Sequence, residues 1–188
     1  GRILCVANRR SGTLSLVDTE RRHVSERQIG QQLSDVVVVP GSDQMLVTDF
    51  AGSMVVVVNH SEDGLNISDR VEVAAWPESV VVNQDGDVAC VASLWSRRVS
   101  ILALREPAQG VTRRFAMQHQ IDLPFAPKAS VFVGADHVVV ADCFGGRLAV
   151  IDCEAGVISA VHELPVHNIR DIAVGLDGRL YLTCQRLN

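Results

Sequence analysis

The most constraining feature of the sequence is an internal repeat. Five segments share an apolar run that ends in a small residue followed by a polar one: ILCVAN, MLVTDF, ACVASL, VVVADC and LYLTCQ. Their small residues are Ala7, Thr48, Ala92, Ala141 and Thr183, which stand 41, 44, 49 and 42 residues apart. Self-similarity at such a period is typical of folds that repeat one supersecondary unit. The repeat therefore decides which fold classes we consider.

Each unit reads as antiparallel strands joined by tight turns. A second apolar strand follows four of the five segments, and a strand ending in a Gly- or Asp-bearing turn precedes each later copy. A more polar fourth strand completes a unit. Valine is abundant, aromatic residues make up only 4% of the chain, and no stretch shows a sustained helical period. We therefore expect strands and almost no helix.

Four antiparallel strands in each unit predict an all-β fold, a β-propeller of four-stranded blades. A sandwich or flat barrel would not need repeats this regular. The innermost strand of a blade should be covered on both faces, and Val36–Val39 and Val80–Val82 are continuously apolar in that way. The outer strands carry more charge, which suits a solvated rim.

Lettering the strands of a blade A (inner) to D (outer) divides the chain into about four blades. The sequence reads BCD, ABCD, ABCD, ABCD and AB. The predicted boundaries are 1–30 for strands B to D of the first blade, then 31–75, 76–124 and 125–165, and 166–188 for two strands of a further blade. A closed four-bladed ring would leave one strand over, so we expect part of a larger ring. Its uncovered blade faces should favour association.

Composition and motifs argue against several functions. The net charge is −5 and basic residues are scattered, so a nucleic-acid partner is not expected. No apolar run approaches the roughly 18–20 residues of a membrane span, and no signal peptide is recognisable. The chain lacks a Gly-rich phosphate loop, H-E-x-x-H and G-x-S-x-G. We predict no catalytic residue, metal or cofactor in this chain, and five reduced, structural cysteines.

Candidate binding residues gather where the D–A crossovers and B–C loops emerge together, at the mouth of the central channel. Arginines there could hold a carboxylate or phosphate, aspartates could orient them or bind a cation, and a histidine could act as base or metal ligand. The candidates are His167, Asn168, Arg170 and Asp171 in the last crossover, and Asp49, Trp95, Arg97, Asp142 and Arg147 in the loops.

A structural reading competes with each candidate. Asp49 and Asp142 stand at equivalent places in two units, which a loop-capping role would also produce. Trp95 is expected to pack beside a blade edge rather than to form a stacking platform. The cluster from His167 to Asp171 occurs in only one unit, so it is the first place to look for a site.

The stretch LCVANRRSGTLSLVDTERRHVSERQIG resembles the YVTN family of bacterial β-propellers, with DGD at Asp85–Asp87 and DGR at Asp177–Arg179 as the turns. The segments VASLWSRRVSIL, VADCFGGRLAVID and HNIRDIAVGLDGR are similar to the propeller part of planctomycete-type proteins that also carry a c-type haem domain. The resemblance implies a ring of about seven blades, an extracytoplasmic location and haem c in another domain. The haem-attachment motif C-x-x-C-H is absent from this chain.

Two classes of function remain open. The first is a non-catalytic binding scaffold for a protein, a carbohydrate or further domains of its own protein. The second is the propeller portion of an enzyme, either a c-type haem oxidoreductase or a lactonase-like hydrolase. Fold alone does not choose between them, because propellers host many unrelated functions.

Overall fold

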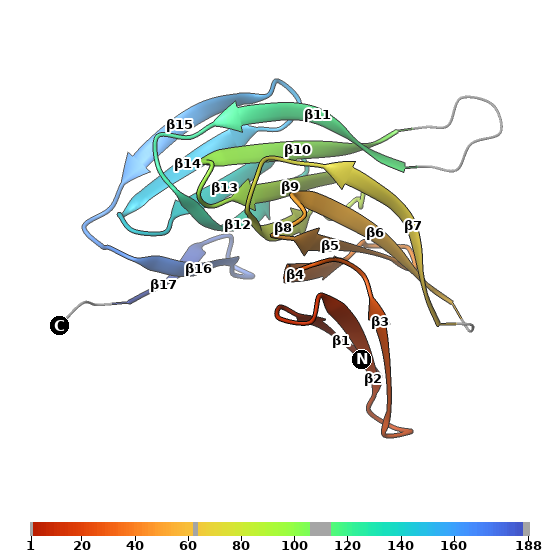
Figure 1. Cartoon of the computed structure of the whole chain (residues 1–188). Coiled ribbons are helices and arrows are strands. Elements are labelled where there is room, and N and C mark those ends of the chain that lie inside the picture. The colour runs from red at the N-terminus through yellow and green to blue at the C-terminus, as the bar shows by residue number, and fades with distance from the viewer. Residues whose placement is uncertain (1, 62–63, 106–113, 186–188) are drawn as a thin grey trace.

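The computed structural model describes residues 2–61, 64–105 and 114–185, and within these ranges every regular element is a strand. The strands form five antiparallel sheets that follow one another along an open arc (Figure 1). The first and last sheets lie at the two ends of the arc. The prediction of an all-β propeller built from four-stranded antiparallel sheets is confirmed.

Strand order within each sheet follows the chain. The first sheet contains β1 (Ile3–Asn8), β2 (Thr13–Asp18) and β3 (His23–Gln28), and the last contains β16 (Ile169–Val174) and β17 (Leu180–Cys184). Three complete sheets lie between them: β4 (Leu33–Val38), β5 (Gln44–Asp49), β6 (Met54–Ser61) and β7 (Gly64–Glu72); β8 (Pro77–Val82), β9 (Val88–Ser93), β10 (Arg98–Arg105) and β11 (Arg114–Asp122); β12 (Pro127–Val133), β13 (His137–Asp142), β14 (Arg147–Asp152) and β15 (Val157–Glu163).

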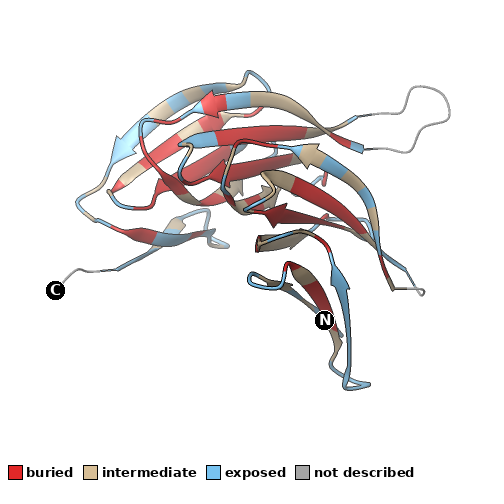
Figure 2. Ribbon diagram, in the orientation of Figure 1, coloured by how far each residue is buried: buried red, intermediate tan, exposed pale blue. Residues whose placement is uncertain are grey.

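The core consists of apolar layers between neighbouring sheets. Leu46, Val91 and Phe115 belong to the layer between the second and third sheets, and Ile101 and Phe125 to the next layer. β-Branched side chains on both faces of a strand suit this arrangement, because each middle strand is covered on two sides. Buried residues follow the middle strands, whereas the outer strands β3 and β15 are largely exposed (Figure 2).

The prediction that the inner strand is covered on both faces is only partly met. The second strands β5, β9 and β13 are buried along almost their whole length, whereas β4 and β8 are mostly half-buried and Val38 is 56% exposed. The second strand has a hydrogen-bonded neighbour on each edge and a sheet against each face. The inner strand is the terminal strand of its sheet and has a hydrogen-bonded neighbour on one edge only, so its apolar run is partly covered.

All four inner strands begin with a β-bulge. The register shifts between Leu33 and Asp35, and equivalent shifts lie in β8, β12 and β16. A bulge adds one residue that opposes no partner and re-aims its side chain. The added residues are Ser34, Glu78, Lys128 and Arg170. The fold thus directs one polar residue of each inner strand out of the ladder on the same face of the arc. This face, where the D–A crossovers and B–C loops emerge, is called the mouth end.

Polar contacts at these bulges link the second and third sheets. The Asp35 carboxylate accepts hydrogen bonds from its own strand, at Val36 N (2.8 Å), and from the next inner strand, at Val80 N (3.0 Å). The Ser34 hydroxyl donates to the Pro77 carbonyl at 2.6 Å. Burial raises the pKa of Asp35 above 3.8, although both N–H donors act to lower it.

This pKa shift predicts a pH-dependent contribution to stability. Because the folded chain holds the Asp35 proton more tightly than the unfolded chain, stability is lost as pH rises from 3.8 through the raised folded-state pKa. The Asp35→Asn variant cannot ionise and lacks this loss. The unfolding free energy of wild type minus that of the variant should therefore fall with pH over this range in urea titrations. The exposed Asp43→Asn serves as control, and a difference that rises with pH would contradict the assignment.

Candidate functional site

The charged residues at the bulges are paired across sheets. Lys128 forms an ion pair with the Glu78 carboxylate, whose other oxygen lies 3.4 Å from Arg9 Nη1. The Arg9 guanidinium also lies 4.7 Å from the centre of the Phe50 ring. These contacts connect the first, third and fourth sheets at the mouth end of the arc, so these charges already serve a structural purpose.

Asp49 is a loop cap. Its buried carboxylate accepts hydrogen bonds from the main-chain N–H groups of Gln31 (2.9 Å), Gln32 (2.9 Å) and Gly52 (3.2 Å). The B–C loop and the incoming crossover are tied together through this one side chain. Gly52 must be glycine here, because a Cβ would lie 2.4 Å from the carboxylate oxygen. Asp49 therefore has a full set of partners and lies apart from the two pockets described below.

Asp142 holds Arg147 in a fixed position. The buried carboxylate lies 2.7 Å from both Nε and Nη2 of Arg147 and accepts the Phe144 N–H at 3.1 Å. Arg147 Nη1 donates to the Pro124 carbonyl at 3.1 Å, and the guanidinium carbon lies 5.2 Å from the centre of the Phe125 ring. A guanidinium bound on several sides is pre-organised, and this one still exposes 38% of its side chain.

The last crossover has structural contacts of the kind seen in the other crossovers. Asn168 is buried with φ at 55°, and its carbonyl accepts the Gln185 N–H at 3.0 Å, as the carbonyls of Gln32, Trp76 and Ala126 accept the corresponding N–H in their sheets. Asp171 accepts the Ile172 N–H at 2.9 Å, just as Asp35 accepts that of Val36. Arg170 Nη2 donates to Gln185 Oε1 at 2.6 Å. Asn168 and Asp171 thus make contacts that recur in other crossovers, whereas the contact of Arg170 stays within the last sheet.

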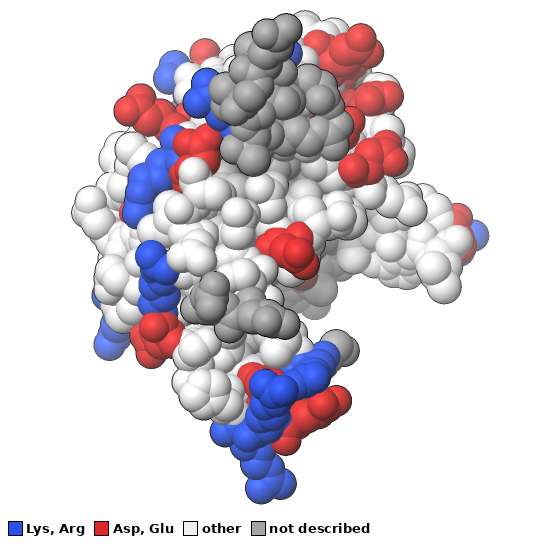
Figure 3. All heavy atoms as spheres, turned by 90° about the vertical axis from the view of Figure 1, so that its right-hand side faces the viewer, with Lys and Arg blue, Asp and Glu red and all other residues white. Residues whose placement is uncertain are grey.

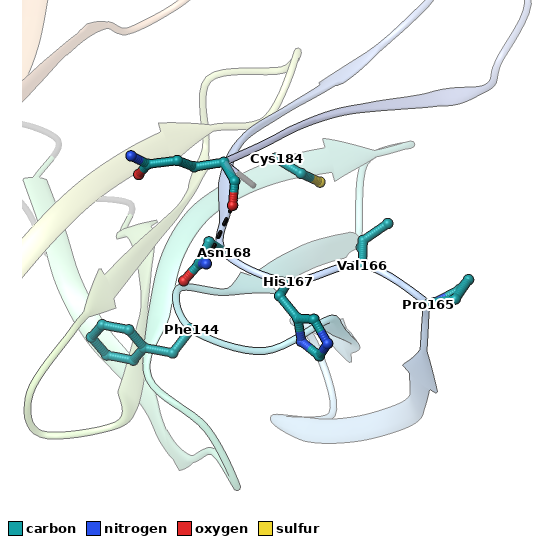
Figure 4. A pocket seen from close by; sticks show the side chains of 7 residues that line it. Phe144, Pro165, Val166, His167, Asn168 and Cys184 are labelled. Atoms are coloured by element: carbon teal, nitrogen blue, oxygen red, sulfur yellow. Dashed lines mark hydrogen bonds between the residues drawn. The ribbon is translucent and has the colours of Figure 1, made fainter. Parts of the chain in front are cut away.

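Two pockets adjoin at the mouth end. The larger, of about 740 Å³, is bounded by the crossover from Pro165 to Asn168, by Cys184 and Gln185, and by Phe144 (Figure 4). The His167 ring projects away from Asn168 (Figure 4). The smaller pocket, of about 260 Å³, is lined by Trp95, Arg97, Phe125, Asp142, Phe144 and Arg147. Phe144 lines both pockets, so they share a wall.

Trp95 and Phe144 form an exposed aromatic pair. Their ring centres are 5.9 Å apart and their planes are inclined by 34°, while 57% of Trp95 and 51% of Phe144 stays exposed. The expectation that Trp95 packs beside a blade edge is therefore wrong for most of its surface. Phe144 was missing from the candidate set. Its signal was the repeat itself, since both aromatic residues stand two places after the last residue of a second strand.

The structure thus brings some sequence candidates together and separates others. Trp95, Arg97, Asp142 and Arg147 share the smaller pocket, and His167 and Asn168 line the larger one; the remaining candidates Asp49, Arg170 and Asp171 line neither. Among the described residues, no group of three or more His, Cys, Asp and Glu side chains could hold a metal ion. The described part of the chain also contains no helix long and apolar enough to cross a membrane.

The face of the arc opposite the mouth end carries both basic and acidic side chains. Figure 3 views the molecule from the side where β6 and β10 end, and basic and acidic side chains both lie along its margin. At one end of the first sheet, Arg2 and Arg21 lie beside Asp18. Such interspersed charges do not favour a phosphate backbone as partner.

Replacing Asp49 tests its role as a loop cap. The Asp49→Ala variant leaves three main-chain N–H groups without their acceptor, which should lower the unfolding free energy by about 1–3 kcal/mol. Urea unfolding followed by circular dichroism measures this loss, with the exposed Asp43→Ala as control. Unchanged stability would show that Asp49 is available for another role.

Replacing Gly146 tests the close approach that shapes the larger pocket. A Cβ on Gly146 would lie 2.2 Å from the Val166 carbonyl oxygen and 2.4 Å from that of Leu164, so the crossover must move. Gly134 has open space around it and a φ of +75°, so Gly134→Ala should cost only the backbone strain of about 1–2 kcal/mol. Thermal unfolding should show a larger loss for Gly146→Ala, and equal losses would contradict the packing.

Comparison with known proteins supports the fold alone. No protein-family model and no curated protein matches the sequence. Solved structures that are similar over 98% of the chain include hydrazine synthase from Kuenenia stuttgartiensis (19% identity, TM-score 0.79), the Cps50 (Swd1) β-propeller domain from Myceliophteria thermophila (17%, 0.76) and a protein assigned as a 6-phosphogluconolactonase from Bacteroides uniformis (14%, 0.79). The chain spans 53%, 59% and 61% of their respective lengths. At these identities the likeness establishes a β-propeller fold and no shared activity.

Proposed function

We propose that this chain is a non-catalytic β-propeller binding module whose ligand surface is the mouth end of the arc. The observation that carries the proposal is the exposed Trp95–Phe144 pair, which lines the smaller pocket and whose Phe144 also lines the larger one. Large aromatic side chains dominate interface energetics and are costly to leave in water. In a chain with only 4% aromatic residues, two of them placed side by side in solvent favour a recognition role.

The occupied polar groups favour binding over catalysis. A catalytic acid or base needs a proton to exchange with substrate and a partner that orients it. Asp49 and Asp142 are saturated by main-chain N–H groups and Arg147, and Asp171 accepts a main-chain N–H of its own strand. Among the described residues, the exposed His167 has no hydrogen-bonding side-chain partner that would orient its ring. These groups build the surface on which a ligand can rest.

The resemblance to YVTN repeats supports an extracytoplasmic module that binds a protein, a carbohydrate or further domains of its own protein. A haem-bearing domain would have to lie elsewhere, because the cysteines of this chain do not fit covalent haem. None belongs to C-x-x-C-H, and Cys90, Cys143 and Cys153 are buried. The enzyme alternatives, a c-type haem oxidoreductase or a lactonase-like hydrolase, are kept as outcomes of the experiment below.

Arrays of defined oligosaccharides and defined peptides test the proposal. We expect at least one class to bind wild type and to be lost in the double variant Trp95→Ala/Phe144→Ala. A matched double variant, His60→Ala/Asp85→Ala, alters a pocket at the opposite end of the arc and should keep binding. Both variants are checked by circular dichroism.

Two results would overturn the proposal. The first is binding that only the opposite-end variant loses. The second is turnover of a panel of lactones, followed by the release of acid, that the mouth variant abolishes. Turnover would assign the mouth to a hydrolase instead of a binding module.

A further inference from the structure

The smaller pocket has a lining that points to one class of ligand. Two aromatic faces, those of Trp95 and Phe144, stand beside a rim of charged groups from Arg97, Asp142 and Arg147. A sugar ring has the complementary pattern, because its faces carry C–H groups and its edge carries hydroxyls. The pocket volume of about 260 Å³ lies below the range of about 300–1,000 Å³ that is usual for drug-sized ligands, so it suits a single ring.

We propose that this pocket binds one pyranose ring of an acidic oligosaccharide, with the ring against Trp95 and Phe144 and the acidic group on Arg97. This inference rests on the proposed binding function and names its ligand class. The sugar hydroxyls would meet the exposed part of Arg147, which the buried Asp142 carboxylate and the Pro124 carbonyl hold rigidly. Rigid polar groups lower the entropy cost of binding.

The main chain around the pocket argues against an extended peptide as ligand. A peptide that binds by adding a β-strand needs free backbone donors and acceptors on its partner. Here the Leu94 N–H is bonded to the Trp76 carbonyl, and the Phe144 N–H to Asp142. The Ala126 and Pro124 carbonyls are likewise engaged, by Cys143 N–H and Arg147. Recognition is left to side chains, which suits a ligand rich in hydroxyl groups.

The charge balance of the lining favours an anionic ligand. Arg147 is neutralised by Asp142, whereas Arg97 is exposed and, within the described residues, forms no ion pair. The neighbouring Arg98 is paired with Asp122 at 2.6 Å, so Arg97 alone carries unbalanced charge at this pocket. Guanidinium groups bind carboxylates and sulfates through paired N–H donors. An acidic sugar would therefore bind better than its neutral counterpart.

The backbone of Arg97 supplies a separate observation. Its φ is 52°, in the left-handed region, at the loop position that Gly12 occupies in the first sheet with a φ of 70° and Ser53 in the second with a φ of 53°. A long side chain in this conformation costs free energy that glycine would avoid. The chain keeps an arginine there at the cost of local strain. The loop imposes this conformation, so glycine can replace Arg97 without disturbing the backbone.

The position of Phe144 extends the inference from one ring to a chain of rings. Phe144 lines both the smaller pocket and the larger one of about 740 Å³. A ligand seated on Trp95 can continue past Phe144 toward His167 without crossing the core. An oligosaccharide of several units fits this path, whereas a single monosaccharide would use only part of it.

Titration with trigalacturonate tests the proposal, with its methyl ester and maltotriose as neutral probes of the same length. We expect wild type to bind trigalacturonate more tightly than either neutral probe, and less tightly as salt rises. The chain has two tryptophans, so a Trp76→Phe variant reports on Trp95 alone. The fluorescence of this variant should change on binding, because its remaining tryptophan, Trp95, lines the pocket.

Two variants test the aromatic contact with the sugar ring and the charge contact with its acidic group separately. Trp95→Ala should raise the Kd for all bound sugars about tenfold, as loss of an aromatic anchor does. Arg97→Gly should raise the Kd for trigalacturonate by a similar factor, remove the preference over the methyl ester, and keep the melting temperature or raise it because glycine relieves the backbone strain. Arg98→Ala removes a neighbouring charge outside the pocket and should change neither the Kd for trigalacturonate nor the preference over the methyl ester.

The outcomes distinguish this inference from the proposed function. Failure of both trigalacturonate and a sulfated trisaccharide to bind, or an equal effect of Arg98→Ala and Arg97→Gly, overturns the acidic-sugar assignment. If defined peptides bind wild type but not the Trp95→Ala/Phe144→Ala variant, the binding function is supported and the sugar ligand is contradicted. A sulfated trisaccharide that binds while trigalacturonate does not would support an acidic sugar whose acidic group is a sulfate.

Discussion

Face-to-face packing of neighbouring sheets is the interaction on which the rest of the structure depends. Apolar, mostly β-branched side chains of the middle strands fill the layers between sheets, and no sheet has a core of its own. Each blade is therefore stable only against its neighbours, as in other repeat folds. Because the loops take their positions from this packing, the geometry of the mouth is set by contacts far from it.

The bulge at the start of each inner strand places a polar residue at the mouth end of the packed sheets. It directs Ser34, Glu78, Lys128 and Arg170 out of their ladders, and these residues link neighbouring sheets or their own hairpin. The B–C loops close over them with capping aspartates where the repeat supplies one. Most polar residues of the mouth thus form hydrogen bonds or ion pairs that hold the loops in place. The residues left over, Trp95, Phe144, Arg97 and His167, define the surface that a ligand can reach.

Sequence reasoning was accurate where a local pattern carried the information. Alternation, turn residues and the repeat predicted strands and the propeller, because these depend on neighbours along the chain. It was less accurate for burial and contact. The valine run of β4 is apolar yet half-exposed, since β4 is the terminal strand of its sheet. Asn168 and Asp171 looked unique to one crossover, although their main-chain contacts recur in other sheets.

By itself the sequence determined an all-β propeller, because a repeated apolar pattern with tight turns has few other ways to bury its strands. Only the tertiary structure decided which polar groups are free. Asp49 and Asp142 read alike in sequence, yet one caps a crossover and the other anchors an arginine. Trp95 and Phe144 come from loops of different sheets, and their meeting depends on how those sheets pack. Contacts between sheets follow from three-dimensional packing, and no local pattern encodes them.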